Sequence, residues 1–121
     1  MSEIILPKKN IDDRFINVSQ INRQFREIAK VQNWQAYHAP KNLAAAVVVE
    51  ASELLAEFQW LTATESQNLS REKKTKVAHE VADVIMYLSE LCEQLDIDIA
   101  VATQEKFEIN QRRFINNASA E

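Results

Sequence analysis

Apolar residues recur at intervals of three and four residues in four segments of the chain, which is the spacing of helices that bury one face. These segments cover about residues 19–32, 41–60, 70–95 and 96–115. No segment shows the strong alternation of apolar and polar residues that is typical of a half-buried strand. The pattern therefore predicts an all-α protein, a four-helix bundle whose apolar faces meet.

Polar residues at the ends of these segments predict where the helices begin. Ser19 and Ser70 are expected to cap the first and third helices, because a serine hydroxyl accepts a hydrogen bond from a free amide of the first turn. Pro40 suits the start of the second helix, and Asp96 or Asp98 suits the start of the fourth.

The same pattern divides the chain into three parts. Residues 1–17 show no helical spacing and are expected to form a non-helical N-terminal arm. Residues 18–116 form the predicted helical domain, and residues 117–121 form a tail that should fray. A length of 121 residues is enough for one domain with one core.

Composition narrows the possible functions. The chain contains no glycine, so the glycine-rich phosphate loops of the P-loop and dinucleotide-binding folds are excluded. The net charge of −4 and the lack of a strongly basic stretch argue against nucleic acid as a partner. The single cysteine, Cys92, cannot form an intrachain disulfide. The longest apolar run, residues 43–49, is too short to cross a membrane, so we expect a soluble, cytoplasmic protein.

Two acidic pairs lie along the apolar faces of the second and third helices. Glu50 and Glu53 share one face of the second helix, and Glu80 and Asp83 share one face of the third. Glu50 falls within the apolar stripe, and the other three acids line the borders of the stripes. When two such helices pack together, we expect these borders to meet and the four carboxylates to converge.

Carboxylates placed against a core need a partner, because burying bare charge is costly. All-oxygen ligation suits Mg²⁺, with Mn²⁺ as a substitute. A di-iron site is the nearest competitor, but it requires Glu-x-x-His on two helices, and here the second position is Glu53 or Asp83. One such pair alone is a weak signal. Glu90 and Glu93 have the same spacing, but they point away from the stripe and are interpreted as solvated.

The order E-x-x-E, then a gap over residues 54–79, then E-x-x-D resembles the all-α nucleoside triphosphate pyrophosphohydrolases, the MazG-like family. The run NWQAYHAPKNLAAAVVVEASELLAEFQW and the ending KFEINQRRF are similar to segments of the compact dCTP-hydrolysing branch, so the resemblance covers roughly residues 19–114. It implies hydrolysis of a nucleoside triphosphate, with dCTP first and dATP next, to the monophosphate and pyrophosphate. It also implies a bundle of the all-α NTP pyrophosphatase type.

The resemblance assigns roles to the four acids. It implies that Glu50, Glu53, Glu80 and Asp83 hold the Mg²⁺ ions of the substrate, and that Glu53 orients or deprotonates the attacking water. It further implies a homodimer or homotetramer with pockets near the subunit contacts. The rival hypothesis is a non-catalytic helical module that binds a cation or a partner, which would release no pyrophosphate.

A polar face of the fourth helix is a candidate for phosphate binding. Lys106, Asn110 and Arg113 follow one another at helical spacing and can grip a triphosphate. An ordinary solvated surface has the same pattern, so both interpretations stay open.

Aromatic residues around the second helix are candidates for nucleobase binding. Trp34, His38 and Trp60 flank that helix and can stack on a base, although core packing is the commoner role of tryptophan. Tyr87 lies one turn after Asp83, where it can hydrogen-bond a sugar or phosphate or pack at the edge of the core.

Overall fold

The computed structural model describes residues 16–116, and all of its regular structure is helical. The α-helices are α1 (Val18–Val31), α2 (Pro40–Ala56), α3 (Ala63–Ser66), α4 (Arg71–Gln94) and α5 (Ile99–Asn110). A short 3₁₀ helix, Trp34–Tyr37, joins α1 to α2, and a π-helical turn, Gln111–Asn116, continues α5. The predicted all-α class is confirmed. Most of the predicted arm (residues 1–15) and all of the predicted tail (residues 117–121) lie outside the described residues.

Three of the helix starts are those that the sequence predicts. Pro40 is the first residue of α2, where its missing amide hydrogen costs nothing. The hydroxyl of Ser70 accepts a hydrogen bond from the Lys73 amide at 3.1 Å and caps α4. The Asp98 carboxylate accepts from the Val101 amide, also at 3.1 Å, and caps α5. Asp96, the other candidate, has the left-handed φ of 54° within the turn before α5.

The cap of α1 and the end of α2 differ from the predictions. Asn17, two residues before the predicted Ser19, caps α1, and its side-chain oxygen accepts from the Gln20 amide at 3.0 Å. Helix α2 ends at Ala56 rather than at Trp60. Beyond Ala56 the amides bond three residues back instead of four, which tightens the last turn and ends the helix.

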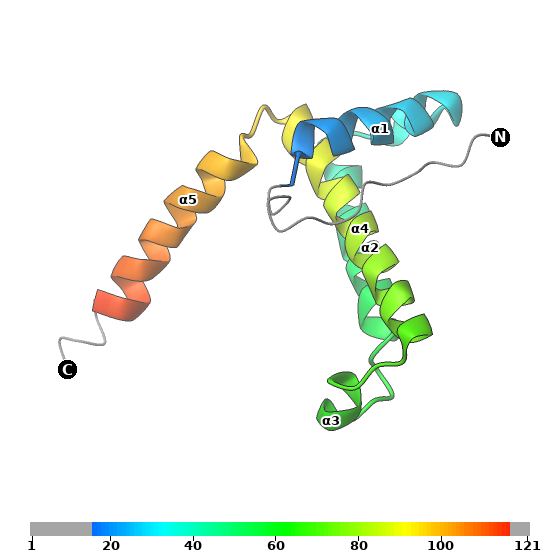
Figure 1. Cartoon of the computed structure of the whole chain (residues 1–121). Coiled ribbons are helices and arrows are strands. Elements are labelled where there is room, and N and C mark those ends of the chain that lie inside the picture. The colour runs from blue at the N-terminus through cyan, green and yellow to red at the C-terminus, as the bar shows by residue number, and fades with distance from the viewer. Residues whose placement is uncertain (1–15, 117–121) are drawn as a thin grey trace.

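Helices α2 and α4 run antiparallel and side by side, and α1 packs across the C-terminal half of α4 (Figure 1). The short α3 lies at the far end of the α2–α4 pair (Figure 1). Helix α5, the fourth helix of the predicted bundle, leaves the end of α4 and stands away from the others (Figure 1). Within residues 16–116, none of the helices combines the length and apolar character that crossing a bilayer requires.

Candidate active site

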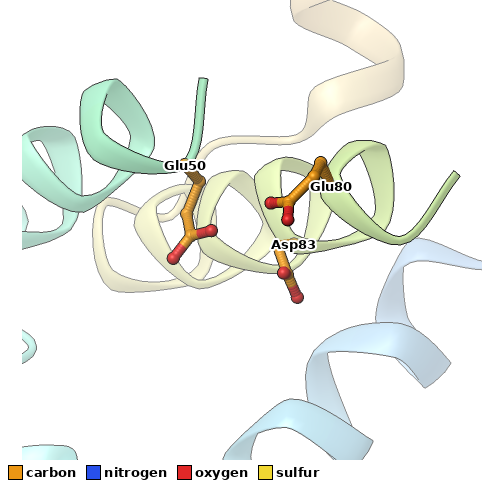
Figure 2. Close-up of side chains that lie close together, drawn as sticks. All are labelled: Glu50, Glu80 and Asp83. Atoms are coloured by element: carbon orange, nitrogen blue, oxygen red, sulfur yellow. The ribbon is translucent and has the colours of Figure 1, made fainter. Parts of the chain in front are cut away.

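Three acidic side chains converge where α2 packs against α4. Glu50 comes from α2, and Glu80 and Asp83 come from successive turns of α4 (Figure 2). Each residue offers one carboxylate oxygen, and these three oxygens all lie within 4.8 Å of one another. All three side chains are half-buried. The acidic borders of the two helices therefore meet, as their spacing predicts.

Glu53 approaches the same cluster from the solvent side. It lies one turn after Glu50 on α2 and is exposed. Its charge and its hydrogen bonding raise the pKa of both Glu50 and Glu80, so its carboxylate faces both of these groups. Glu53 thus borders the group of three acids rather than lying within it.

Two buried carboxylate oxygens of the acid cluster meet no hydrogen-bond donor among residues 16–116. Burial, hydrogen bonding to Glu53 and the charges of the other three acids raise the pKa of Glu50 to about 7. Burial and the charges of Glu53 and Asp83 likewise raise the pKa of Glu80. In both residues Oε2 is buried and accepts no hydrogen bond from the part of the chain that the structure describes. Carboxylate oxygens that lack a hydrogen bond and repel one another are suitable ligands for a hard divalent cation, which would neutralise their charge.

An aromatic cluster lies beside the acids. The His38 ring stacks on Phe25 with centroids 5.6 Å apart and planes at 8°, and Trp34 lies 6.5 Å from His38. Tyr87 meets Phe25 and His38 edge-on, at 5.2 and 6.3 Å. Burial and the charges of Glu50, Asp83 and Glu53 raise the pKa of Tyr87, which places its hydroxyl between the aromatic rings and the acids.

The MazG-like family model matches residues 45–120, which is more than half of the chain and includes all four acids. The chain belongs to the MazG-like family. The resemblance that the motifs indicate is thereby confirmed.

Several relatives are similar to this MazG-like chain. Human dCTP pyrophosphatase 1 is 34% identical over 99 residues, which cover 80% of this chain and 58% of the human protein. The mouse protein of the same name is 31% identical over 99 residues, which again cover 80% of this chain and 58% of the relative. The chain therefore spans less than two thirds of the length of these relatives. A pyrophosphatase from Archaeoglobus fulgidus, solved as a crystal structure, is 33% identical with a TM-score of 0.74. The match covers 87% of this chain and 98% of the archaeal chain.

Four of the predicted substrate-binding residues lie away from this MazG-like acid cluster. Trp60 is 87% exposed in the turn beyond α2. Lys106 and Asn110 belong to α5, and Arg113 belongs to the π-helical turn that follows it. Because α5 stands apart from α2 and α4, a single chain does not bring these three to the acids (Figure 1). The guanidinium of Arg113 lies over the neighbouring Phe114 ring, 5.0 Å from its centroid.

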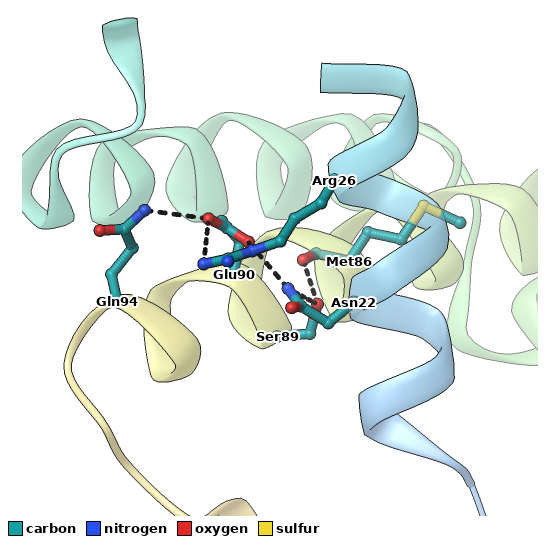
Figure 3. Close-up of polar contacts among 6 residues, drawn as sticks. All are labelled: Asn22, Arg26, Met86, Ser89, Glu90 and Gln94. Atoms are coloured by element: carbon teal, nitrogen blue, oxygen red, sulfur yellow. Dashed lines mark hydrogen bonds and ion pairs between the residues drawn. The ribbon is translucent and has the colours of Figure 1, made fainter. Parts of the chain in front are cut away.

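Two ionic contacts of α4 were not predicted from the sequence. Lys73 Nζ lies 2.7 Å from Glu57 Oε2, which joins α4 to the end of α2. The interpretation of Glu90 as solvated is wrong, because this residue is only 3% exposed. Its carboxylate accepts hydrogen bonds from Asn22 and Arg26 of α1 and from Gln94 (Figure 3). The sequence does place two donors, Asn22 and Arg26, four residues apart on α1, but they indicate a partner on α4 only once the crossing of the two helices is known.

Proposed function

We propose that this chain hydrolyses a nucleoside triphosphate to the nucleoside monophosphate and pyrophosphate, with dCTP as the first candidate substrate and dATP as the second. The convergence of Glu50, Glu80 and Asp83 carries this proposal, because three carboxylate oxygens within 4.8 Å fit a divalent cation. The names of the human and archaeal relatives support the reaction class. Such an enzyme would act on free nucleotides in the cytoplasm and requires neither nucleic acid nor a membrane as a partner.

Mg²⁺ is the proposed cofactor, with Mn²⁺ as a substitute. Glu50, Glu53, Glu80 and Asp83 would hold it, and the unpaired Oε2 atoms of Glu50 and Glu80 support this assignment. When bound, the ions neutralise the charge that develops on the phosphates during transfer. Four protein carboxylates leave coordination positions for phosphate oxygens of the substrate.

Glu53 is the proposed catalytic residue. Among the four acids it has the most open position, and its carboxylate faces both Glu50 and Glu80. A carboxylate at the solvent side of the cluster can hold a water molecule and accept its proton as the oxygen attacks phosphorus. The more buried acids have less access to such a water.

The aromatic cluster is the proposed nucleobase pocket. Trp34 is 38% exposed and offers a ring face on which a base can stack, and the buried His38 ring packs beside it. Trp60, also predicted to bind the base, lies beyond the opposite end of α2, so within one chain it stands apart from this cluster. Tyr87 lies between this pocket and the acids, where its hydroxyl can hydrogen-bond the sugar or a phosphate. This order of aromatic rings, hydroxyl and acids matches the order of base, sugar and phosphates in a nucleotide.

A second copy of the chain is proposed to complete the phosphate site. Lys106, Asn110 and Arg113 suit a triphosphate, but in one chain they stand away from the acids (Figure 1). Helix α5 and the π-helical turn after it also expose apolar side chains, since Phe107 is 57% and Phe114 is 61% exposed. In a homodimer or homotetramer, the apolar side of α5 can pack against a second copy, and the polar side of α5 can then reach the acids of that copy.

A substrate panel tests the proposal. Each dNTP is incubated with the purified chain in Mg²⁺, in Mn²⁺ and in EDTA, and pyrophosphate release is recorded. The proposal predicts metal-dependent release that is fastest with dCTP or dATP. A non-catalytic helical module that only binds a cation or a partner would release none above background.

A further inference from the structure

Donors from two helices gather around the buried carboxylate of Glu90. Asn22 Nδ2 and Arg26 Nε each donate to Oε2 at 2.8 Å. Arg26 Nη2 and Gln94 Nε2 donate to Oε1 at 3.1 and 3.0 Å. Burial by itself would raise the pKa of Glu90, but these hydrogen bonds outweigh it and the pKa lies below its usual value. Glu90 is therefore ionised at neutral pH and holds Arg26 by a two-point contact (Figure 3).

The network holds one particular turn of α1. Asn22 and Arg26 flank Phe25, which is 6% exposed and forms the floor on which the His38 ring stacks. Phe25 also meets Tyr87, which lies one turn before Glu90 on α4. A small cavity of about 120 Å³ is lined by both Glu90 and His38, so the network and the proposed base pocket are immediate neighbours.

Stability alone does not explain an ion pair that buries a carboxylate at this position, where the Glu90 side chain is 4% exposed and that of Arg26 is 42% exposed. Replacing such a pair by well-packed apolar residues is often neutral or stabilising, because desolvation of the charges offsets their attraction. What the ion pair adds is a defined register, since the planar guanidinium meets the carboxylate in one geometry only. This geometric constraint adds to the apolar packing of α1 on α4.

We infer that Glu90 is a positioning residue for the nucleotide pocket: it fixes the register of α1 on α4, so that Phe25 and the His38 ring buried against it support Trp34 and Tyr87 at the pocket. This inference rests on the proposed function. The four acids lie on α2 and α4, outside the part of α1 that the network holds. Loss of the network should therefore weaken substrate binding and spare the chemical step.

The variant Glu90→Gln keeps the shape of the side chain and removes its charge. For the preferred dNTP, KM should rise roughly tenfold or more, which is the scale for losing hydrogen bonds to a charged group, and kcat should stay within about threefold. Glu72→Gln is the control, because it removes the same charge from an exposed position in the first turn of α4, away from Arg26. KM of the control should stay at the wild-type value. Kinetics are measured at a temperature at which thermal melts show each variant fully folded.

A second variant and a second readout keep the test decisive. Arg26→Lys keeps the charge and loses the two-point contact, so it should raise KM by a smaller factor even if Glu90→Gln does not fold. The chain has two histidines, so the imidazole resonances of His38 can be assigned by replacing His79. In Glu90→Gln or Arg26→Lys these resonances should lose the ring-current shift that stacking on Phe25 produces.

The outcomes separate this inference from the proposed function. A higher KM together with shifted His38 resonances supports it. An unchanged KM, a loss confined to kcat, or His38 resonances identical to those of the wild type would overturn it. If the wild-type chain hydrolyses no dNTP, the proposed function fails, and the His38 resonances alone then decide whether Glu90 sets the position of the aromatic cluster.

Discussion

Glu50 on α2 and Glu80 on α4 each bury one carboxylate oxygen at the same helix contact, and neither Oε2 atom meets a donor among residues 16–116. Asp83 brings a third carboxylate to within 4.8 Å of both. Among residues 16–116 no ion pair joins these three acids to a cationic side chain, so their mutual repulsion destabilises the contact between the two longest helices of that part of the chain. A divalent ion that binds there would remove this repulsion and stabilise the fold.

Metal should therefore raise the thermal stability of the chain. At a Mg²⁺ concentration of about one hundred times Kd, linkage predicts a gain of about 2.7 kcal/mol in the free energy of unfolding. Differential scanning fluorimetry in Mg²⁺ and in EDTA measures the shift in Tm. In Glu80→Gln, the metal-free protein should melt higher than the wild type and respond less to Mg²⁺. Equal Tm values with and without metal in the wild type would count against a site at this contact.

The metal-free chain should become less stable as pH rises toward 7. The pKa of Glu50 is raised from its ordinary 4.5 to about 7 in the folded state, so folding favours its protonated form. The stability that this proton provides is complete below about pH 4.5 and is lost as pH rises through about 7. The free energy of unfolding is measured against pH in EDTA for the wild type and for Glu50→Gln, and the difference between the two curves isolates this contribution. If the wild type instead gained stability relative to Glu50→Gln as pH rises, the prediction would be contradicted.

Mg²⁺ binding should show the opposite pH dependence, because the ion and the proton compete for Glu50. Isothermal titration calorimetry at several pH values should give a Kd that falls as pH rises from 5 to 7 and protons that are released on binding. Glu50→Gln should show a weaker affinity and a flatter pH profile.

Glu53→Gln should abolish turnover and leave the fold intact. Loss of a general base costs typically 10²- to 10⁴-fold in kcat, and the exposed position of Glu53 means that the substitution leaves no buried group unpaired. Glu105→Gln, which neutralises an exposed acid on α5, is the control and should retain full activity. Circular dichroism checks that both variants are helical. A Glu53→Gln enzyme with wild-type kcat would remove Glu53 from the mechanism.

Subunit mixing tests whether α5 acts on the site of another copy. Glu53→Gln and Arg113→Ala chains should each be inactive alone. In a random mixture of equal amounts, a homodimer that exchanges α5 regains about a quarter of its sites, because each hybrid holds one site with intact acids and an intact arginine. Mixtures that stay inactive after subunit exchange, while size-exclusion chromatography shows hybrids, would place Arg113 outside the site of the second copy.

Much of the acid cluster could be predicted from the chain because its causes are local. Glu50 and Glu80 lie on or beside apolar stripes, and two stripes that pack must bring their borders together. The caps at Ser70 and Asp98 depend on one side chain and one amide three residues away, so they too could be predicted.

Features that depend on packing between distant segments could not be predicted. Glu90 lies off the main stripe of α4, and two of its three donor residues, Asn22 and Arg26, come from α1, about 65 residues earlier in the chain. The position of α5 could not be predicted either. The spacing of its residues shows that the helix has an apolar and a polar side, but it does not show against which other helix each side packs. The early end of α2 depends on tightened turns that no residue type in this segment requires.

The most direct test of the account is the identity of the products formed from dCTP in Mg²⁺, followed by ³¹P NMR. We expect dCMP and pyrophosphate in equal amounts, with no product in EDTA. Formation of dCDP and orthophosphate, or intact dCTP after prolonged incubation with the folded, metal-loaded chain, would contradict it.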